Sequence, residues 1–187
     1  MAEVKNNIVT HGMSGSIGKQ LVFKRYGNRT IVSAMPDMSK VVKSKKQKSE
    51  NTKFRDAIAY ARGQMADPVS KAEYKAKAEG MQKAHNIAIA DFYHAPEIRR
   101  VETESIKTTQ TMIIHAIDDF KVVEVSVEVY DMEGVQLEKG QAGEKSLWFW
   151  EYRINTDISL HKGLRLLVTA FDKPGNKTTQ ELEITLS

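Results

Sequence analysis

The chain of 187 residues contains no cysteine. A disulfide framework and a thiolate metal site are therefore excluded, and the absence of cysteine favours a reducing compartment. Residues 1–23 hold no apolar segment of signal-peptide length, and no apolar run approaches the ~20 residues that span a bilayer. We therefore expect a protein without membrane insertion, in the cytoplasm or inside a particle assembled there.

Motifs for catalysis and for metal or phosphate binding are also missing. The glycine-rich stretch 11–18 is not followed by the Gly-Lys-Ser/Thr of a phosphate loop, and no serine lies in a nucleophile elbow. The histidines show no spacing typical of ligands; they are His11, His85, His94, His115 and His161. We therefore expect no enzyme, no cofactor and no metal, and we interpret His85 as a packing side chain.

The net charge of +4 is unevenly distributed along the chain. Residues 1–96 carry 17 Lys and Arg against 8 Asp and Glu, a balance of +9, whereas residues 97–187 carry 11 against 16, a balance of −5. This asymmetry predicts two domains, 1–96 and 97–187, with faces that pair with each other or with neighbouring copies. Two ordinary domains of unlike isoelectric point would give the same numbers.

The first domain reads as a β-hairpin followed by a helical hairpin. Gly27-Asn28 favours a tight turn between strands at 17–26 and 29–35. One helix is predicted over 49–65, and a second from a capping box at Ser70 and Glu73 to Pro96, with Gly80 as a point of division. Their apolar stripes contain Phe54, Ile58, Ala61 and Met65, then Tyr74, Ala78, Met81, His85, Ala88 and Phe92.

Basic residues in this domain are candidates for contact with a polyanion. They include the densest positive run of the chain, 40–48, which can equally be a solvated linker. The candidate contacts are Lys24, Arg25, Arg29, Lys40, Lys43, Lys45, Lys46, Lys48, Lys53 and Arg55.

From Thr111 the hydrophobic period changes from 3.6 to 2, which indicates β-strands. About seven short strands separated by turns predict an antiparallel sandwich. In the fifth strand we expect Trp148 and Trp150 on the inner face and Phe149 on the outer face. Phe149 would form a protein-interface patch with Leu167 and Phe171 if their strands are neighbours.

Two segments carry a family resemblance: Ile114-His-Ala-Ile-Asp-Asp-Phe-Lys-Val-Val-Glu-Val and Gly163-Leu-Arg-Leu-Leu-Val-Thr-Ala-Phe-Asp-Lys-Pro-Gly-Asn-Lys177. Over about residues 105–187 the chain resembles bacterial immunoglobulin-like domains, without the paired cysteines of the antibody type. Such domains serve as spacers, adhesins, capsid decorations and docking modules. In some related sandwiches acidic loop residues hold calcium; here turn formation accounts for Asp118, Asp119, Asp172 and Asn176 without a metal. Residues 1–96 resemble no characterised family.

Together these patterns predict an α+β protein: a β-hairpin and a helical hairpin, followed by a seven-stranded immunoglobulin-like antiparallel β-sandwich. The function that we expect is a non-catalytic binding or structural module. In such a module, the basic first domain is an anchor that displays or docks the immunoglobulin-like domain, in a bacterial or phage-derived assembly. The protein would bind either a protein partner or further copies of itself. The alternative is an accessory protein that binds nucleic acid independently of sequence through its basic half.

Overall fold

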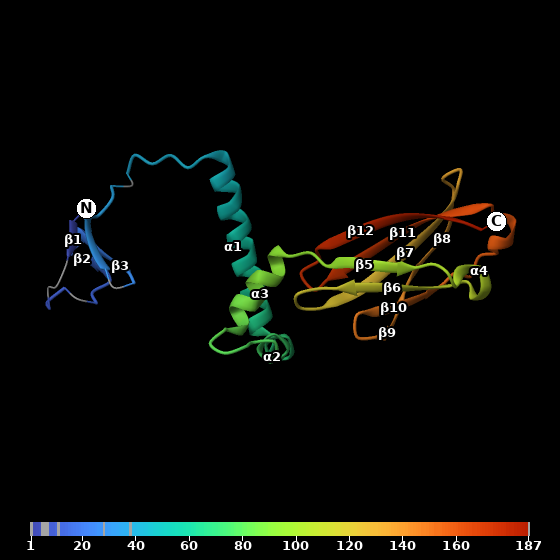
Figure 1. Ribbon diagram of the computed structural model, residues 1–187, viewed down its shortest axis with the longest axis horizontal. Coiled ribbons are helices and arrows are strands. Elements are labelled where there is room, and N and C mark those ends of the chain that lie inside the picture. The colour runs from blue at the N-terminus through green and yellow to red at the C-terminus, as the bar shows by residue number, and fades with distance from the viewer. Residues whose placement is uncertain (1, 5–7, 11, 28, 38, 187) are drawn as a thin grey trace. The chain divides into compact units, whose positions relative to one another are not determined.

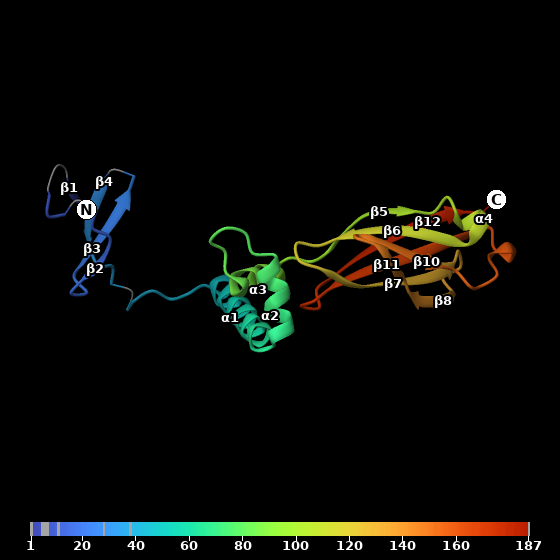
Figure 2. The same cartoon turned by 90° about the horizontal axis from the view of Figure 1, so that it is seen from below.

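The computed structural model describes residues 2–4, 8–10, 12–27, 29–37 and 39–186. His11 and Asn28, on which two of the sequence interpretations fall, lie outside the described residues. The chain divides into two compact units, Met1–Lys48 and Ser49–Ser187, here called the amino-terminal and the carboxy-terminal unit. The fold class is α+β, with helices and three antiparallel sheets (Figures 1 and 2).

The amino-terminal unit contains one antiparallel sheet in the order β1-β4-β3-β2. Its strands are β1 (Ala2–Val4), β2 (Gly15–Ile17), β3 (Leu21–Tyr26) and β4 (Arg29–Ala34). The predicted hairpin is confirmed, because β3 pairs with β4 from Tyr26↔Arg29 to Leu21↔Ala34. Strand β2 was not predicted; it lies in the glycine-rich stretch, which sequence reasoning interpreted as an arm or irregular turn.

Three helices follow: α1 (Lys45–Ala66), α2 (Pro68–Ala76) and α3 (Ala84–Tyr93). The capping box at Ser70 is wrong, since Asp67 caps α2 by accepting a hydrogen bond from the Ser70 backbone N–H at 2.9 Å. Proline suits the first helical position, where no donor is needed, and Pro68 is the first residue of α2. Gly80 divides the predicted second helix, as expected, and has φ +58° in the connection between α2 and α3.

The helices share a small core made by Ala61, Tyr74, Ala88 and Phe120, with Tyr60, Met65 and Ile87 among its partly buried neighbours. Two predicted stripe residues are exposed instead of buried. Met81 is fully exposed because it lies in the connection after Gly80, and Phe54 is 49% exposed because it lies in the first half of α1, where residues 45–56 are all exposed. Among the described residues no helix is both long and apolar enough to cross a bilayer.

Two further sheets enclose the main core. One has the order β5-β6-β10-β9, built from β5 (Glu97–Glu102), β6 (Thr111–Ile117), β10 (Phe149–Arg153) and β9 (Gly143–Ser146). The other has the order β12-β11-β7-β8, built from β12 (Lys177–Thr185), β11 (Gly163–Asp172), β7 (Val122–Asp131) and β8 (Gln136–Gln141). Alternate side chains of both sheets point into one core that includes Ile114, Val127, Trp150, Leu166 and Val168. A short helix α4 (Ile106–Thr109) and a 3₁₀ turn (Ile158–Leu160) lie in the connections.

These sheets hold eight strands where the sequence predicted seven, and the additional one is β9. It was missed because Gly143–Ser146 carries no apolar alternation and its side chains are exposed. Trp148 also differs from expectation. It is 52% exposed and lies in the turn between β9 and β10 with φ +70°, so it does not share the inner face with the buried Trp150.

The compact units do not coincide with the predicted domains 1–96 and 97–187. The three helices lie beside the β6–β7 and β11–β12 turns (Figures 1 and 2), because side chains from these turns insert among them. The two further sheets and the helices from Ser49 onward therefore belong to one unit.

Candidate functional site

The junction between the helices and the two sheets is the most densely bonded region that sequence reasoning missed. Phe120, from the β6–β7 turn, stacks on Tyr74 of α2 with ring centroids 3.9 Å apart. Lys173, from the β11–β12 turn, donates to Glu73 at 2.5 Å and to Ser70 at 3.0 Å. Asn176 donates from Nδ2 to the carbonyls of Asp91, Phe92 and His94 at the carboxyl end of α3.

Asp91 is a buried ionisable group of this junction. It lies on α3, is 1% exposed, and accepts a hydrogen bond from the Tyr74 hydroxyl at 2.5 Å; Tyr74 is also within hydrogen-bond distance of Tyr60. Burial raises the pKa of the Asp91 carboxyl to about 7, while the Tyr74 hydrogen bond opposes that shift. Burial also raises the pKa of Asp172, opposed by hydrogen bonds from Asn176.

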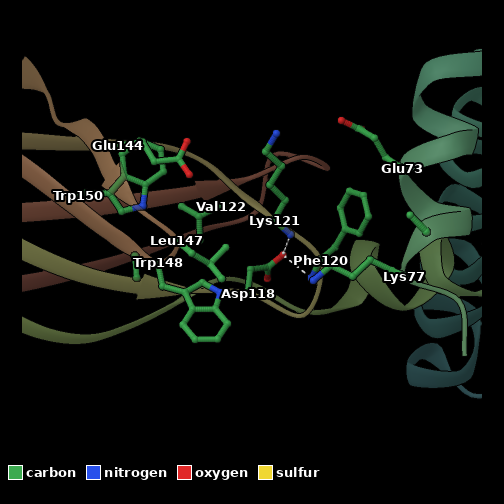
Figure 3. A pocket seen from close by; sticks show the side chains of 12 residues that line it. Glu73, Lys77, Asp118, Phe120, Lys121, Val122, Glu144, Leu147, Trp148 and Trp150 are labelled. Atoms are coloured by element: carbon green, nitrogen blue, oxygen red, sulfur yellow. Dashed lines mark hydrogen bonds between the residues drawn. The ribbon is translucent and has the colours of Figure 1, made fainter.

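A groove of about 370 Å³ lies between α2 and the sheets. Figure 3 shows Glu73 and Lys77 on the helical side and Leu147, Trp148 and Trp150 on the sheet side. Leu147 is 68% exposed, and Trp148 is half-exposed. Exposed apolar groups beside a groove with charges at its rim are typical of a protein-docking surface.

The turn between β9 and β10, which carries Leu147 and Trp148, is held by a hydrogen bond to β6. The Trp148 carbonyl accepts a hydrogen bond from Ala116 N–H at 3.0 Å, which anchors the turn to β6. A positive φ is unusual for a bulky residue and costs free energy, so the surrounding bonds must maintain it. The result is a tryptophan held partly in solvent.

The predicted patch of Phe149, Leu167 and Phe171 does not form. Phe149 is on β10, whereas Leu167 and Phe171 are on β11 in the other sheet, so the condition that their strands are neighbours is not met. Phe149 does face outward, as predicted; its ring is 37% exposed and stacks on His115 with centroids 4.7 Å apart. Leu167 and Phe171 are partly buried.

The predicted polyanion contacts are distributed over both units. All ten are exposed: Lys24 and Arg25 are on β3, Arg29 is on β4, Lys40 and Lys43 precede α1, and Lys45, Lys46, Lys48, Lys53 and Arg55 are on α1. Three lysines of the 40–48 run, for which a linker was the alternative, thus belong to the first turn of a helix. Lys53 lies over the Tyr93 ring at 4.7 Å.

One side of α1 is basic. Lys48, Arg55 and Arg62 recur at seven-residue intervals and therefore follow one another along the helix. Ala57 and Ala61, which are buried, lie on the opposite side. Sequence reasoning did not include Arg62, although its spacing from Arg55 was a usable signal.

The sheet of the amino-terminal unit has one mainly apolar face. Directly paired residues share a face, so the register places Ile17, Leu21, Phe23, Val32 and Ala34 on one face, with Thr30 and Arg25 at its end. The opposite face carries Ser16, Val22, Lys24, Tyr26, Arg29, Ile31 and Ser33. Among the described residues of this unit only Phe23 and Thr30 are buried, while Ile17 is 56% and Leu21 is 44% exposed.

In comparisons with known proteins, no family model and no curated protein matches the chain.

Proposed function

We propose that this protein is a non-catalytic assembly module, in which the amino-terminal unit of one copy binds the carboxy-terminal unit of another. The observation that carries the proposal is the apolar face of the first sheet. A four-stranded sheet gains little stability unless one face is covered. Here Ile17 and Leu21 remain about half exposed, and Phe23 is the buried apolar side chain of that face.

Charge selects the partner. The amino-terminal unit, residues 1–48, carries 10 Lys and Arg against 2 Asp and Glu, a balance of +8. Residues 49–187 carry 18 against 22, a balance of −4. Two amino-terminal units therefore repel each other, whereas unlike units of neighbouring copies attract, which favours head-to-tail association.

The groove beside Trp148 is the receiving surface that we propose. It offers apolar area at Leu147 and Trp148 for Ile17 and Leu21 of the next copy, with Glu73 and Glu144 at its rim for the basic residues of that copy. A buried aromatic anchor surrounded by charges is the usual composition of a protein interface.

We propose further that the two sheets are an immunoglobulin-like sandwich. Support comes from the strand order: β5-β6-β10-β9 corresponds to A-B-E-D of that fold, and β12-β11-β7 to G-F-C. Strand β8 is then an additional strand beside C. A bacterial or phage-derived particle is the setting that this type of module suggests.

Sedimentation velocity over a range of protein concentrations tests the assembly proposal. We expect the full chain to associate as its concentration rises at about 50 mM salt. At about 500 mM salt it should dissociate, because the shorter Debye length screens the attraction between exposed charges of neighbouring copies. Two variants should each weaken association: Ile17→Asn in the sheet and Trp148→Asn in the groove. Asparagine is chosen at 148 because it tolerates a positive φ.

Tyr26→Asn is the matched control for the sheet. Tyr26 is 60% exposed but lies on the opposite face from Ile17. Association should survive this change. A protein that stays monomeric at every concentration, or that loses association equally in the control, contradicts the proposal.

A second candidate function, binding of nucleic acid, is favoured by the basic side of α1. Cations that lie together on one folded surface favour contact with phosphates more than cations that are spread through a loose loop. Lys48, Arg55 and Arg62 satisfy that condition on the helix face away from Ala57 and Ala61. We propose that this side of α1 contacts phosphates without reading bases.

Fluorescence anisotropy with a random DNA duplex tests this second function. Binding should weaken steeply between about 50 and 200 mM salt, and replacing Lys48, Arg55 and Arg62 by glutamine should reduce both the affinity and the salt dependence. Lys139→Gln, a change of one exposed lysine on β8, is the control for the loss of one positive charge away from α1. No binding by the wild-type chain at the lower salt concentration would leave assembly as the proposed function.

A further inference from the structure

Three carboxylates that are distant in sequence meet at the junction. Asp91 comes from α3, Asp118 from the β6–β7 turn and Asp172 from the end of β11, and one carboxylate oxygen of each lies within 4.8 Å of the others. Asp91 and Asp172 are buried, with exposed fractions of 1% and 2%. Like charges at this separation and burial oppose folding strongly unless they are compensated.

Hydrogen bonds account for only some of these oxygens. Oδ2 of Asp91 accepts from Tyr74, Oδ2 of Asp118 accepts from the backbone N–H groups of Phe120 and Lys121, and Asp172 accepts from Gly175 and Asn176. Within the described part of the chain, Oδ1 of Asp91 and Oδ1 of Asp118 are buried and have no hydrogen-bond partner. Buried oxygens of this kind are rare in folded proteins and call for an ion, a proton or water.

The neighbouring cation compensates only in part: the charge of Lys173 acts to lower the pKa of Asp91 but does not outweigh burial, which raises it. Lys173 follows Asp172 in sequence, but its ammonium group bonds to Glu73 and Ser70 on α2 and lies over the Tyr74 ring at 5.3 Å. Asp91 and Asp118 accept their hydrogen bonds from the Tyr74 hydroxyl and from backbone N–H groups.

The donor set identifies the type of ion. Three carboxylate oxygens are hard ligands, which favour Ca²⁺ or Mg²⁺ over metals that prefer nitrogen or sulfur. Oxygens within 4.8 Å of one another are close to the spacing of ligands around one Ca²⁺ ion with bonds of 2.3–2.6 Å, while the shorter bonds of Mg²⁺ require them to be closer.

We infer that Asp91, Asp118 and Asp172 form a divalent-cation site of the calcium type that ties α3 to two turns of the sheets. Phe120, Lys173 and Asn176 already connect the helices to the sheets, and the ion would add a further connection. This inference is independent of the assembly proposal, because the site and its ligands lie within one copy of the chain.

Titration of the full chain with Tb³⁺, a luminescent substitute for Ca²⁺, tests the inference directly. Excitation of Tyr74, whose hydroxyl contacts Asp91, should sensitise a bound Tb³⁺ ion. We expect saturation at one ion per chain and displacement by Ca²⁺. In parallel, about 5 mM CaCl₂ should raise the thermal midpoint of protein first treated with a chelator, because an ion bound only by the native state stabilises it.

Asp91→Asn and Asp118→Asn should each weaken Ca²⁺ binding by about tenfold or more and reduce the rise in midpoint. Both changes keep the shape of the side chain, and circular dichroism shows whether the variants fold. Asp119→Asn is the matched control: Asp119 is next to Asp118 but exposed, and it contacts His94 instead of the cluster.

Two outcomes would overturn the inference. One is a wild-type chain that shows neither sensitised Tb³⁺ luminescence nor a shift in midpoint with Ca²⁺; the three carboxylates then share protons only. The other is ion binding of equal affinity in Asp91→Asn, Asp118→Asn and Asp119→Asn, which would place the ion elsewhere.

Discussion

Glu138 organises a turn from the middle of strand β8. Its carboxylate accepts hydrogen bonds from the Tyr152 hydroxyl at 2.6 Å, from the backbone of Asn155 at 2.9 Å and of Thr156 at 2.8 Å, and from the Thr156 hydroxyl. Gly140 leaves space for this arrangement, since a Cβ atom there would lie 2.8 Å from the Tyr152 oxygen. Glu138 therefore attaches the loop after β10 to strand β8 of the other sheet.

Replacement of Glu138 by glutamine should lower the free energy of unfolding by about 1–3 kcal/mol at neutral pH. Burial acts to raise the pKa of Glu138, but the hydrogen bonds from Tyr152, Thr156 and Asn155 outweigh it and lower the pKa to about 2 from the ordinary 4.5. A lowered pKa means that the stabilisation is complete above pH 4.5 and is lost as the pH falls through about 2.

Urea unfolding of wild type and Glu138→Gln at several pH values measures this effect. The difference between the two proteins should shrink as the pH falls toward 2. A difference that does not change with pH would mean that the carboxylate charge has no part in holding the turn.

At the scale of elements, the β6–β7 connection is both a turn of the sheets and part of the helical core. Asp118 holds its backbone by accepting from Phe120 and Lys121 N–H groups, and this directs the Phe120 ring onto Tyr74. The helices bury few residues among themselves, so a side chain contributed by another element has a large share in their stability.

Phe120→Ala should therefore loosen the helices without unfolding the sheets. Truncation of a buried phenylalanine costs about 3–5 kcal/mol. Hydrogen exchange should show faster exchange for amides of α2 and α3, while amides of β7 and β11 keep their protection. Phe149→Ala, on the outer face of β10, is the control that should leave α2 and α3 unchanged. Equal loss of protection in helices and sheets would show that the two unfold as a single cooperative unit.

At the scale of the whole molecule, the two units differ in how much apolar surface they bury. The carboxy-terminal unit has a continuous core between its sheets and a smaller one among its helices. The described residues of the amino-terminal unit bury only Phe23 and Thr30. Before α1, residues 39–44 adopt neither helix nor strand and expose Lys40 and Lys43.

Limited trypsin digestion at low protein concentration should first cut at Lys40 or Lys43 and leave a resistant fragment that ends at residue 187. Exposed segments without regular structure are preferred cleavage sites, and a sheet without a core opens readily. Mass spectrometry of the early fragments identifies the sites. A resistant fragment that contains residues 1–40, or early cuts within 97–187, would contradict this difference in stability.

Local patterns in the sequence were sufficient for the hairpin, for the division of the helices at Gly80 and for most strands of the sheets. A period of 2 or of 3.6 reflects which side of one element is buried, and tight turns depend on a few neighbouring residues. For the same reason Trp150, within the alternation of β10, was placed correctly, and Phe149 was correctly placed outward.

The candidate sites could not be obtained in that way, because they depend on which elements are neighbours. Nothing in the sequence near Asp118 or Asp172 indicates that Asp91 of α3 joins them, although a carboxylate in the apolar run Ile89–Tyr93 was a signal of a buried charge. Phe149, Leu167 and Phe171 share outward directions, but strand order puts them in different sheets. The sequence alone determined periodicity, turns and charge, which are local properties; only the tertiary structure decided strand order and the helix–sheet junction, because these depend on contacts between residues far apart in the chain.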